Sequence, residues 1–141
     1  MGTVERKRIL LADTDLLSVA TTIGALKDDY HVVTAKSSVE LFKQLQKQQI
    51  DMLILETSLP DMDGFVICRK LKADPATASL PVVFLTRVAT IADEERGFAF
   101  GAVDFVTKPF NAPTLKARLK NQFKLSDAIQ ELQRQPIGAR C

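Results

Sequence analysis

The chain has 141 residues, of which 46% are hydrophobic and 26% charged, and its formal net charge is +2. This composition is that of one globular domain with its own core, and it excludes a strongly charged, disordered chain. No apolar run approaches the roughly 18 residues of a membrane helix, and the N-terminus lacks the apolar segment of a signal peptide, so we expect a cytoplasmic protein without membrane contact.

Short apolar runs that alternate with amphipathic segments predict β/α units around a parallel sheet. The expected strands, rich in Val, Ile, Leu or Phe, are Ile9–Ala12, His31–Thr34, Met52–Leu55, Val82–Leu85 and Val103–Val106. Right-handed crossovers leave few arrangements of such strands, and 2-1-3-4-5 is the common doubly wound order. We therefore predict an α/β fold of the flavodoxin-like (βα)5 type, with its switch point between strands one and three.

Apolar residues at helical spacing predict the helices between these strands. They are Leu16, Val19, Ile23 and Leu26 in the first helix, Leu41, Phe42 and Leu45 in the second, and Ile67, Cys68 and Leu71 in the third. We expect Asp74-Pro75 to end the third helix, and Asn111 with Pro113 to begin the fifth. The fourth helix, near residues 91–100, is the least regular because Gly97 interrupts its pattern.

The last helical pattern continues past Phe123 through Leu125, Ile129 and Leu132, about one heptad, and ends before Pro136-Ile137-Gly138. It is either an overlong last helix or a linker helix to a partner or a further domain. We expect a domain over residues 1–125 and a C-terminal helical extension or linker over residues 126–141.

Basic residues and cysteines suggest no further site. Residues 108–141 hold seven Lys or Arg against two acidic residues, a balance that could attract nucleic acid or an acidic partner. Because no aromatic interleaving or recognition motif accompanies them, a solvated helix face is favoured and direct nucleic-acid binding is not expected. Cys68 and Cys141 provide neither a disulfide framework nor metal-ligand spacing.

Polar residues follow four of the five expected strands. They are Asp13-Thr14-Asp15, Glu56-Thr57, Thr86-Arg87 and Lys108-Pro109. In open α/β sheets ligands bind beyond the carboxyl ends of the strands, where carboxylates can hold Mg²⁺ while a hydroxyl and an ammonium stabilise a phosphoryl oxygen. Singly, Asp13 or Asp15 could cap a helix and Lys108 could be solvated. Their occurrence at four strand ends favours one shared site.

The chain resembles the receiver domain of bacterial two-component response regulators over residues 7–125. The resemblance rests on residues 9–13, 51–56, 59–64, 81–86 and 101–110. It implies an aspartate after strand three that takes phosphate from a histidine kinase, beside Mg²⁺ held by that aspartate and an acidic pair after strand one. It also implies that Thr86 and Lys108 match the residues that bind the phosphoryl group.

Two departures from the family fall on this chemistry: Glu56 replaces the phosphate acceptor, and Thr14 replaces the second acid of the pair. Glutamate extends its carboxylate by one methylene, about 1.5 Å, which spoils in-line phosphoryl transfer. We therefore expect no productive acceptor. Asp13 and Glu56 remain as ligands for weak Mg²⁺ binding at best. The longer side chain also suggests that Glu56 pairs with Lys108 or Thr86 and holds an active-like state.

Two more positions bear on the pocket and on docking. Arg87 stands where the family generally has a small residue, and it either blocks the pocket or pairs with Glu56. Phe105 occupies the family's aromatic switch position, whose ring moves inward on activation; it is otherwise an ordinary half-buried Phe. The resemblance makes the face of the fourth helix, fifth strand and fifth helix the expected docking surface, and it implies a cis Lys108–Pro109 bond.

These features favour a non-enzymatic pseudo-receiver that acts by protein–protein interaction, without a cofactor. Its partner would be a histidine kinase or an output domain, and a homodimer is an alternative. The opposing hypothesis is a working phosphoacceptor with Mg²⁺, using Glu56 or a displaced acceptor such as Asp61 or Asp63. A flavin- or nucleotide-binding enzyme is a third hypothesis, but no Gly-rich phosphate loop follows strand one.

Overall fold

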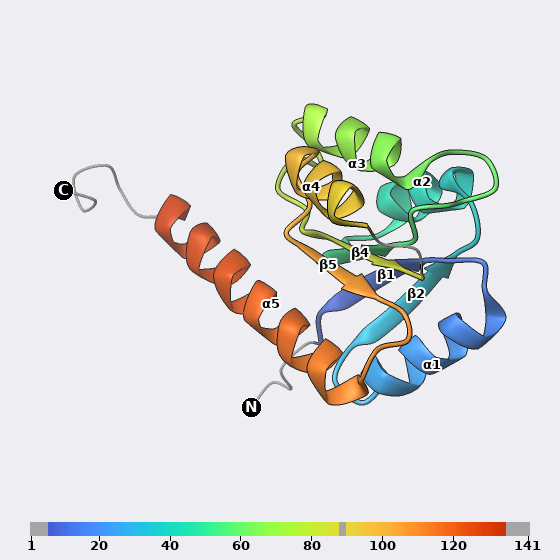
Figure 1. Cartoon of the computed structure of the whole chain (residues 1–141). Coiled ribbons are helices and arrows are strands. Elements are labelled where there is room, and N and C mark those ends of the chain that lie inside the picture. The colour runs from blue at the N-terminus through green and yellow to red at the C-terminus, as the bar shows by residue number, and fades with distance from the viewer. Residues whose placement is uncertain (1–5, 88–89, 135–141) are drawn as a thin grey trace.

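The computed structural model describes residues 6–87 and 90–134, in which strands and helices alternate (Figure 1). The strands are β1 Arg8–Ala12, β2 His31–Ala35, β3 Met52–Leu55, β4 Val82–Thr86 and β5 Asp104–Thr107. The helices are α1 Leu16–Leu26, α2 Ser38–Lys47, α3 Gly64–Ala73, α4 Ile91–Ala99 and α5 Ala112–Arg134. Cys141 and the predicted stop at Pro136-Ile137-Gly138 lie outside the described residues.

The five strands form one parallel sheet in the order β2-β1-β3-β4-β5, which confirms the predicted fold. β1, β3 and β4 occupy its centre, and the side chains of β3 and β4 are buried along their whole length. Strands covered on both faces need continuous rather than alternating apolar sequence, as Met52–Leu55 has. From β1 the chain adds β2 on one side of the sheet, and then adds β3, β4 and β5 on the other side. The carboxyl ends of β1 and β3 therefore border the site at this switch point.

Helices cover both faces of the sheet (Figure 1). On one face α2, α3 and α4 enclose a core that includes Leu41, Phe65 and Phe84. On the other face α1 and α5 enclose a second core that includes Leu26 and Phe123. Helices α1, α2, α3 and α5 each bury side chains along one face, as the sequence periodicity predicts. No described helix has both the length and the hydrophobicity that a membrane span requires.

Side-chain caps fix where the helices begin. Asp15 accepts hydrogen bonds from the backbone at the start of α1, and Asp63 does so at the start of α3. Thr90 and Asp93 form a reciprocal capping box on α4. Asn111 accepts from the amide of Thr114 at the start of α5. These caps place each helix start beside the strand end that precedes it.

Three details differ from the sequence-based expectation. β5 begins at Asp104, because Val103 bonds to the carbonyl of Val82 before the ladder starts. Leu16 is 76% exposed, because α1 turns Ser18, Thr22 and Leu26 toward the interior instead. Gly97 does not interrupt α4; it is the buried residue of that helix and lies against Phe105 and Phe84.

The last helix, α5, runs through 23 residues and extends past the end of the sheet (Figure 1). Leu115, Leu119 and Phe123 are buried against the domain. Beyond them, Leu125, Ile129 and Leu132 are 56%, 48% and 58% exposed. The division of the chain near residue 125 stays a prediction, although burial of the helix falls off at that point.

Candidate functional site

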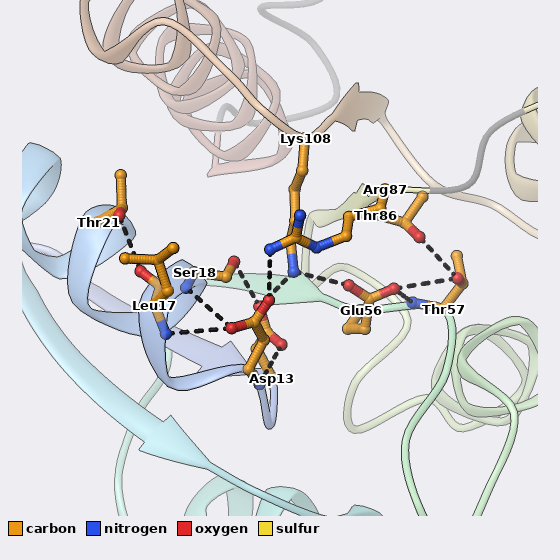
Figure 2. Close-up of polar contacts among 10 residues, drawn as sticks. Asp13, Leu17, Ser18, Thr21, Glu56, Thr57, Thr86, Arg87 and Lys108 are labelled. Atoms are coloured by element: carbon orange, nitrogen blue, oxygen red, sulfur yellow. Dashed lines mark hydrogen bonds and ion pairs between the residues drawn. The ribbon is translucent and has the colours of Figure 1, made fainter.

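The carboxyl ends of the four strands β1, β3, β4 and β5 bring the predicted polar residues together. Asp13 follows β1, Glu56 follows β3, Thr86 ends β4 and Lys108 follows β5. In Figure 2 the side chain of Lys108 points toward Asp13 and Glu56. Parallel strands share one edge for these ends, so residues up to 95 positions apart in sequence come into contact.

Lys108 is at the centre of the site. Its Nζ atom lies 2.7 Å from Oδ2 of Asp13 and 2.8 Å from Oε2 of Glu56. The three side chains are only 5%, 2% and 12% exposed for Lys108, Asp13 and Glu56, respectively. One ammonium therefore neutralises part of the charge of two nearly buried carboxylates, where water screens little.

The charge state of Lys108 follows from these contacts. Burial alone would lower the pKa of Lys108, but the hydrogen bonds and negative charges of Asp13 and Glu56 outweigh burial and hold that pKa above its usual range. Lys108 is therefore a cation throughout the physiological pH range.

Asp13 also accepts hydrogen bonds from α1 and from the loop before it. The hydroxyl of Ser18 donates to Oδ2 of Asp13 at 2.9 Å, and the amide of Asp15 donates to Oδ1 at 3.1 Å. Ser18 was not predicted to belong to the site, although the sequence does place its hydroxyl in the first turn of the helix that follows the first strand. Thr14 lies exposed beside these residues and adds no carboxylate.

Glu56 is linked to Thr86 through Thr57. Oε1 of Glu56 accepts a hydrogen bond from the amide of Thr57 at 3.0 Å. Oγ1 of Thr57 lies 3.2 Å from that same oxygen and 3.1 Å from Oγ1 of Thr86. Of the two expected pairings, the one with Lys108 is thus direct and the one with Thr86 is mediated. No role was predicted for Thr57, and its position next to Glu56 was the only signal in the sequence.

Arg87 pairs with Asp15, so of the two alternatives for this residue the pairing with Glu56 was wrong, while blocking of the pocket stays a prediction. Its Nη2 atom lies 2.7 Å from Oδ2 of Asp15, which also caps α1. This hydrogen bond, followed by that from the Ser18 amide, lowers the pKa of Asp15. It also raises the pKa of Arg87, with smaller contributions from the charges of Asp13 and Glu56. The pair joins the end of β4 to the start of α1.

Phe105 turns its ring into the core between β4 and α4. It is 7% exposed, and its ring centroid lies 5.8 Å from that of Phe84. A Cβ atom on Gly97 would lie 3.2 Å from the Phe105 ring, so the absence of a side chain on Gly97 leaves room for the inward position of that ring. The Lys108–Pro109 bond is cis, as expected.

The acidic residues of the described part of the chain form no cluster that could bind a metal ion. Within residues 6–87 and 90–134, no three His, Cys, Asp or Glu side chains are grouped so that they could hold a metal ion. Asp61 accepts from the amide and the hydroxyl of Ser38 at 2.8 and 2.7 Å, and Asp63 accepts from the amide of Phe65 at 2.7 Å. Both carboxylates serve helix starts rather than the pocket.

Comparison with known proteins identifies the family. Residues 9–120 match the family model described as the response regulator receiver domain. The chain belongs to this family. It is thus a receiver domain of two-component signalling, and Asp13, Glu56, Thr86 and Lys108 lie where the resemblance expected the family's pocket.

Relatives of this receiver domain are longer proteins. The chain is 36% identical to the response regulator PleD of Caulobacter vibrioides over 135 residues, which are 94% of the chain and 30% of PleD. It is 34% identical over 125 residues to RpaA of Synechocystis, a DNA-binding dual master transcriptional regulator, covering 88% of the chain and 52% of RpaA. The chain thus spans about a third to a half of these curated relatives.

Solved structures agree with the fold. The structure of the chemotaxis protein CheY4 of Vibrio cholerae is similar to this receiver domain with a TM-score of 0.77 and 26% identity. The match covers 83% of this chain and 98% of CheY4. The receiver fold is therefore complete within the chain.

Proposed function

We propose that this receiver domain regulates a protein partner without taking a phosphoryl group on residue 56. The observation behind the proposal is the engagement of both carboxylate oxygens of Glu56: Oε2 by Lys108 at 2.8 Å, and Oε1 by Thr57 at 3.0 Å. An oxygen that attacks a phosphoryl group must point a free lone pair in line with the bond to the leaving group, and contacts that orient both oxygens elsewhere oppose this approach.

Side-chain length adds to this barrier. The Glu56 carboxylate lies about one methylene, ~1.5 Å, beyond the position of an aspartate carboxylate at the same backbone site. The extra reach brings the carboxylate to Lys108 and, through the hydroxyl of Thr57, to Thr86. Lys108 and Thr86 are the residues that the resemblance assigns to phosphoryl binding. Glu56 thus makes, as a permanent side chain, contacts that a phosphoryl group would make transiently.

The alternative of a displaced acceptor finds no support in the contacts of Asp61 and Asp63. Hydrogen bonds from Ser38, the backbone amide first, lower the pKa of Asp61 and tie its carboxylate to α2. The side chain of Asp63 caps α3. A phosphoryl group on either residue would break a helix cap, and neither residue contacts Lys108 in the hydrogen bonds and ion pairs above.

We propose the face of α4, β5 and α5 as the docking surface, with the inward ring of Phe105 fixing its shape. The partner is a histidine kinase or an output domain, in the cytoplasm, and a second copy of the chain is the other candidate. The basic residues of α5 support a solvated face rather than nucleic-acid binding, because Lys116 pairs with Asp29 and Arg118 with Asp104. No catalytic role is proposed for the domain.

Beryllofluoride tests the proposal, because it binds an acceptor carboxylate in place of a phosphoryl group. We would record two-dimensional amide NMR spectra of the wild-type protein with Mg²⁺, before and after adding beryllofluoride. The proposal predicts no change at Thr86, Lys108 or α4. Shifts at these positions that disappear in Glu56→Gln would contradict it.

A further inference from the structure

Family membership implies Mg²⁺ in this pocket, but the residues present do not fit a divalent ion. Thr14 offers no carboxylate. Asp13 already accepts from Ser18, Asp15 and Lys108, and Glu56 accepts from Thr57 and Lys108. Lys108 holds Oδ2 of Asp13 and Oε2 of Glu56, and the other oxygen of each carboxylate already accepts a backbone amide. A metal ion, which needs oxygens at about 2.1 Å, would have to compete with these donors and with the Lys108 charge.

Side-chain cations neutralise most of the negative charge around the pocket. Three carboxylates, those of Asp13, Asp15 and Glu56, face two cations, Lys108 and Arg87. Lys108 belongs to the family pattern, whereas Arg87 stands where the family generally has a small residue. The negative charge that a metal ion would neutralise is therefore largely neutralised by side chains, and Arg87 is the addition that makes it so.

Arg87 is also connected by hydrogen bonds to the start of α1. It directly follows β4 and reaches the start of α1, where its partner Asp15 accepts from the amides of Leu17 and Ser18. The same turn carries Ser18, whose hydroxyl holds Asp13. A guanidinium at this place is permanently charged and acts on both the helix start and the carboxylates behind it.

We propose that Arg87 is a resident counter-ion that replaces the metal ion of this receiver pocket and makes the pocket independent of divalent cations. Arg87 acts through charge and through its bond to Asp15, and it is a positioning residue rather than a catalytic one. The inference rests on the proposed function in one respect: both require the Glu56–Lys108 pair to persist.

Direct measurement of metal binding tests the inference. Mn²⁺ substitutes for Mg²⁺, and the electron paramagnetic resonance signal of free Mn²⁺ falls when the ion binds protein. We would titrate wild type, Thr14→Asp, Arg87→Met and the double variant Arg87→Met/Thr14→Asp, without any phosphodonor. Arg87→Met keeps most of the side-chain length and removes the charge. Arg87 is largely exposed, so these variants are expected to fold, which a thermal melt would verify.

We expect wild type to bind Mn²⁺ weakest and the double variant to bind at least about tenfold tighter than Thr14→Asp alone, since one nearby positive charge is removed. Arg87→Lys/Thr14→Asp, which keeps the charge, should bind like Thr14→Asp. Arg118→Met/Thr14→Asp, which removes a surface cation paired with Asp104, should do the same.

Two results would overturn the inference. One is wild-type binding as tight as that of the double variant; the other is equal binding by Thr14→Asp and the double variant. Either result is distinguishable from failure of the proposed function, because the titration contains no beryllofluoride or phosphodonor. A wild-type protein that responds to beryllofluoride would refute the proposed function while leaving the ranking of Mn²⁺ affinities as a separate measurement.

Discussion

The Nζ atom of Lys108 lies 2.8 Å from Oε2 of Glu56, in a pocket where both side chains are nearly buried. The same ammonium lies 2.7 Å from Asp13. Both carboxylates thus form their ion pair with the same cation. Removing that cation would leave two like charges facing each other with little water, and we expect such a change to destabilise the folded protein.

Replacing Lys108 by methionine should lower the free energy of unfolding by about 3 kcal/mol or more, because Asp13 and Glu56 lose their shared partner inside the protein. Urea unfolding at neutral pH measures the change. The matched control is Lys116→Met, whose exposed pair with Asp29 is 3.3 Å long and should be worth less than about 1 kcal/mol. Equal stability of the two variants would count against a buried three-residue ion pair.

The stability advantage of wild type over Lys108→Met should depend on pH at the alkaline end. Because the pKa of Lys108 is raised in the folded protein, its contribution is fully present below the ordinary lysine pKa of about 10.4 and is lost as pH rises through the folded value. Unfolding of both proteins at pH 8 and at about pH 11 should show the gap shrinking. A gap that widens with pH would mean that the sign of the linkage is wrong.

Gly64 should tolerate no side chain, because an added Cβ atom would lie 2.5 Å from the carbonyl oxygen of Glu56 and 2.9 Å from Cα of Thr57. Gly64→Ala should therefore destabilise the fold by about 2 kcal/mol or more and shift the backbone that carries Glu56. Gly24→Ala is the control: Gly24 lies in the last turn of α1 with no neighbouring atom within 4 Å of its added Cβ, so the substitution should stabilise by up to about 1 kcal/mol. Thermal unfolding compares the two, and a loss in both variants would contradict this account.

Removing residues 126–141 should leave the receiver domain folded. The last apolar residue of α5 that is buried is Phe123, and the Lys7–Asp127 pair lies on the surface, so the expected loss is within about 1 kcal/mol. A cooperative urea transition of the shortened chain would support a domain boundary near residue 125. Loss of the cooperative transition would show that the extension is part of the fold.

Much of the fold could be predicted from the sequence because its signals are local. Continuous apolar runs such as Met52–Leu55 define strands buried on both faces, and capping residues such as Asp15 and Asn111 define helix starts. The strand order followed from general rules of handedness. Leu16 was misassigned because helical spacing alone does not say which of two overlapping stripes meets the sheet.

The contacts of the site could be predicted only in part. That Glu56 and Lys108 would meet followed from their places at the same carboxyl-end edge of the sheet, after β3 and β5. The partner of Arg87 did not, because a long flexible side chain at a strand end reaches several carboxylates, and only the geometry selects Asp15 over Glu56. Thr57 and Ser18 were missed for a similar reason: hydroxyls are common in loops and first turns, and their role depends on distances that a linear pattern does not contain.

The most direct test of the central claim, that residue 56 accepts no phosphoryl group, is intact-mass measurement after incubation with acetyl phosphate and Mg²⁺. Wild type would be compared with Glu56→Gln and with Glu56→Asp/Thr14→Asp, which restores both acids of the family pattern. We predict an unchanged mass for wild type and a gain of one phosphoryl group for the double variant. A gain of one phosphoryl group by wild type that is absent in Glu56→Gln would contradict the claim.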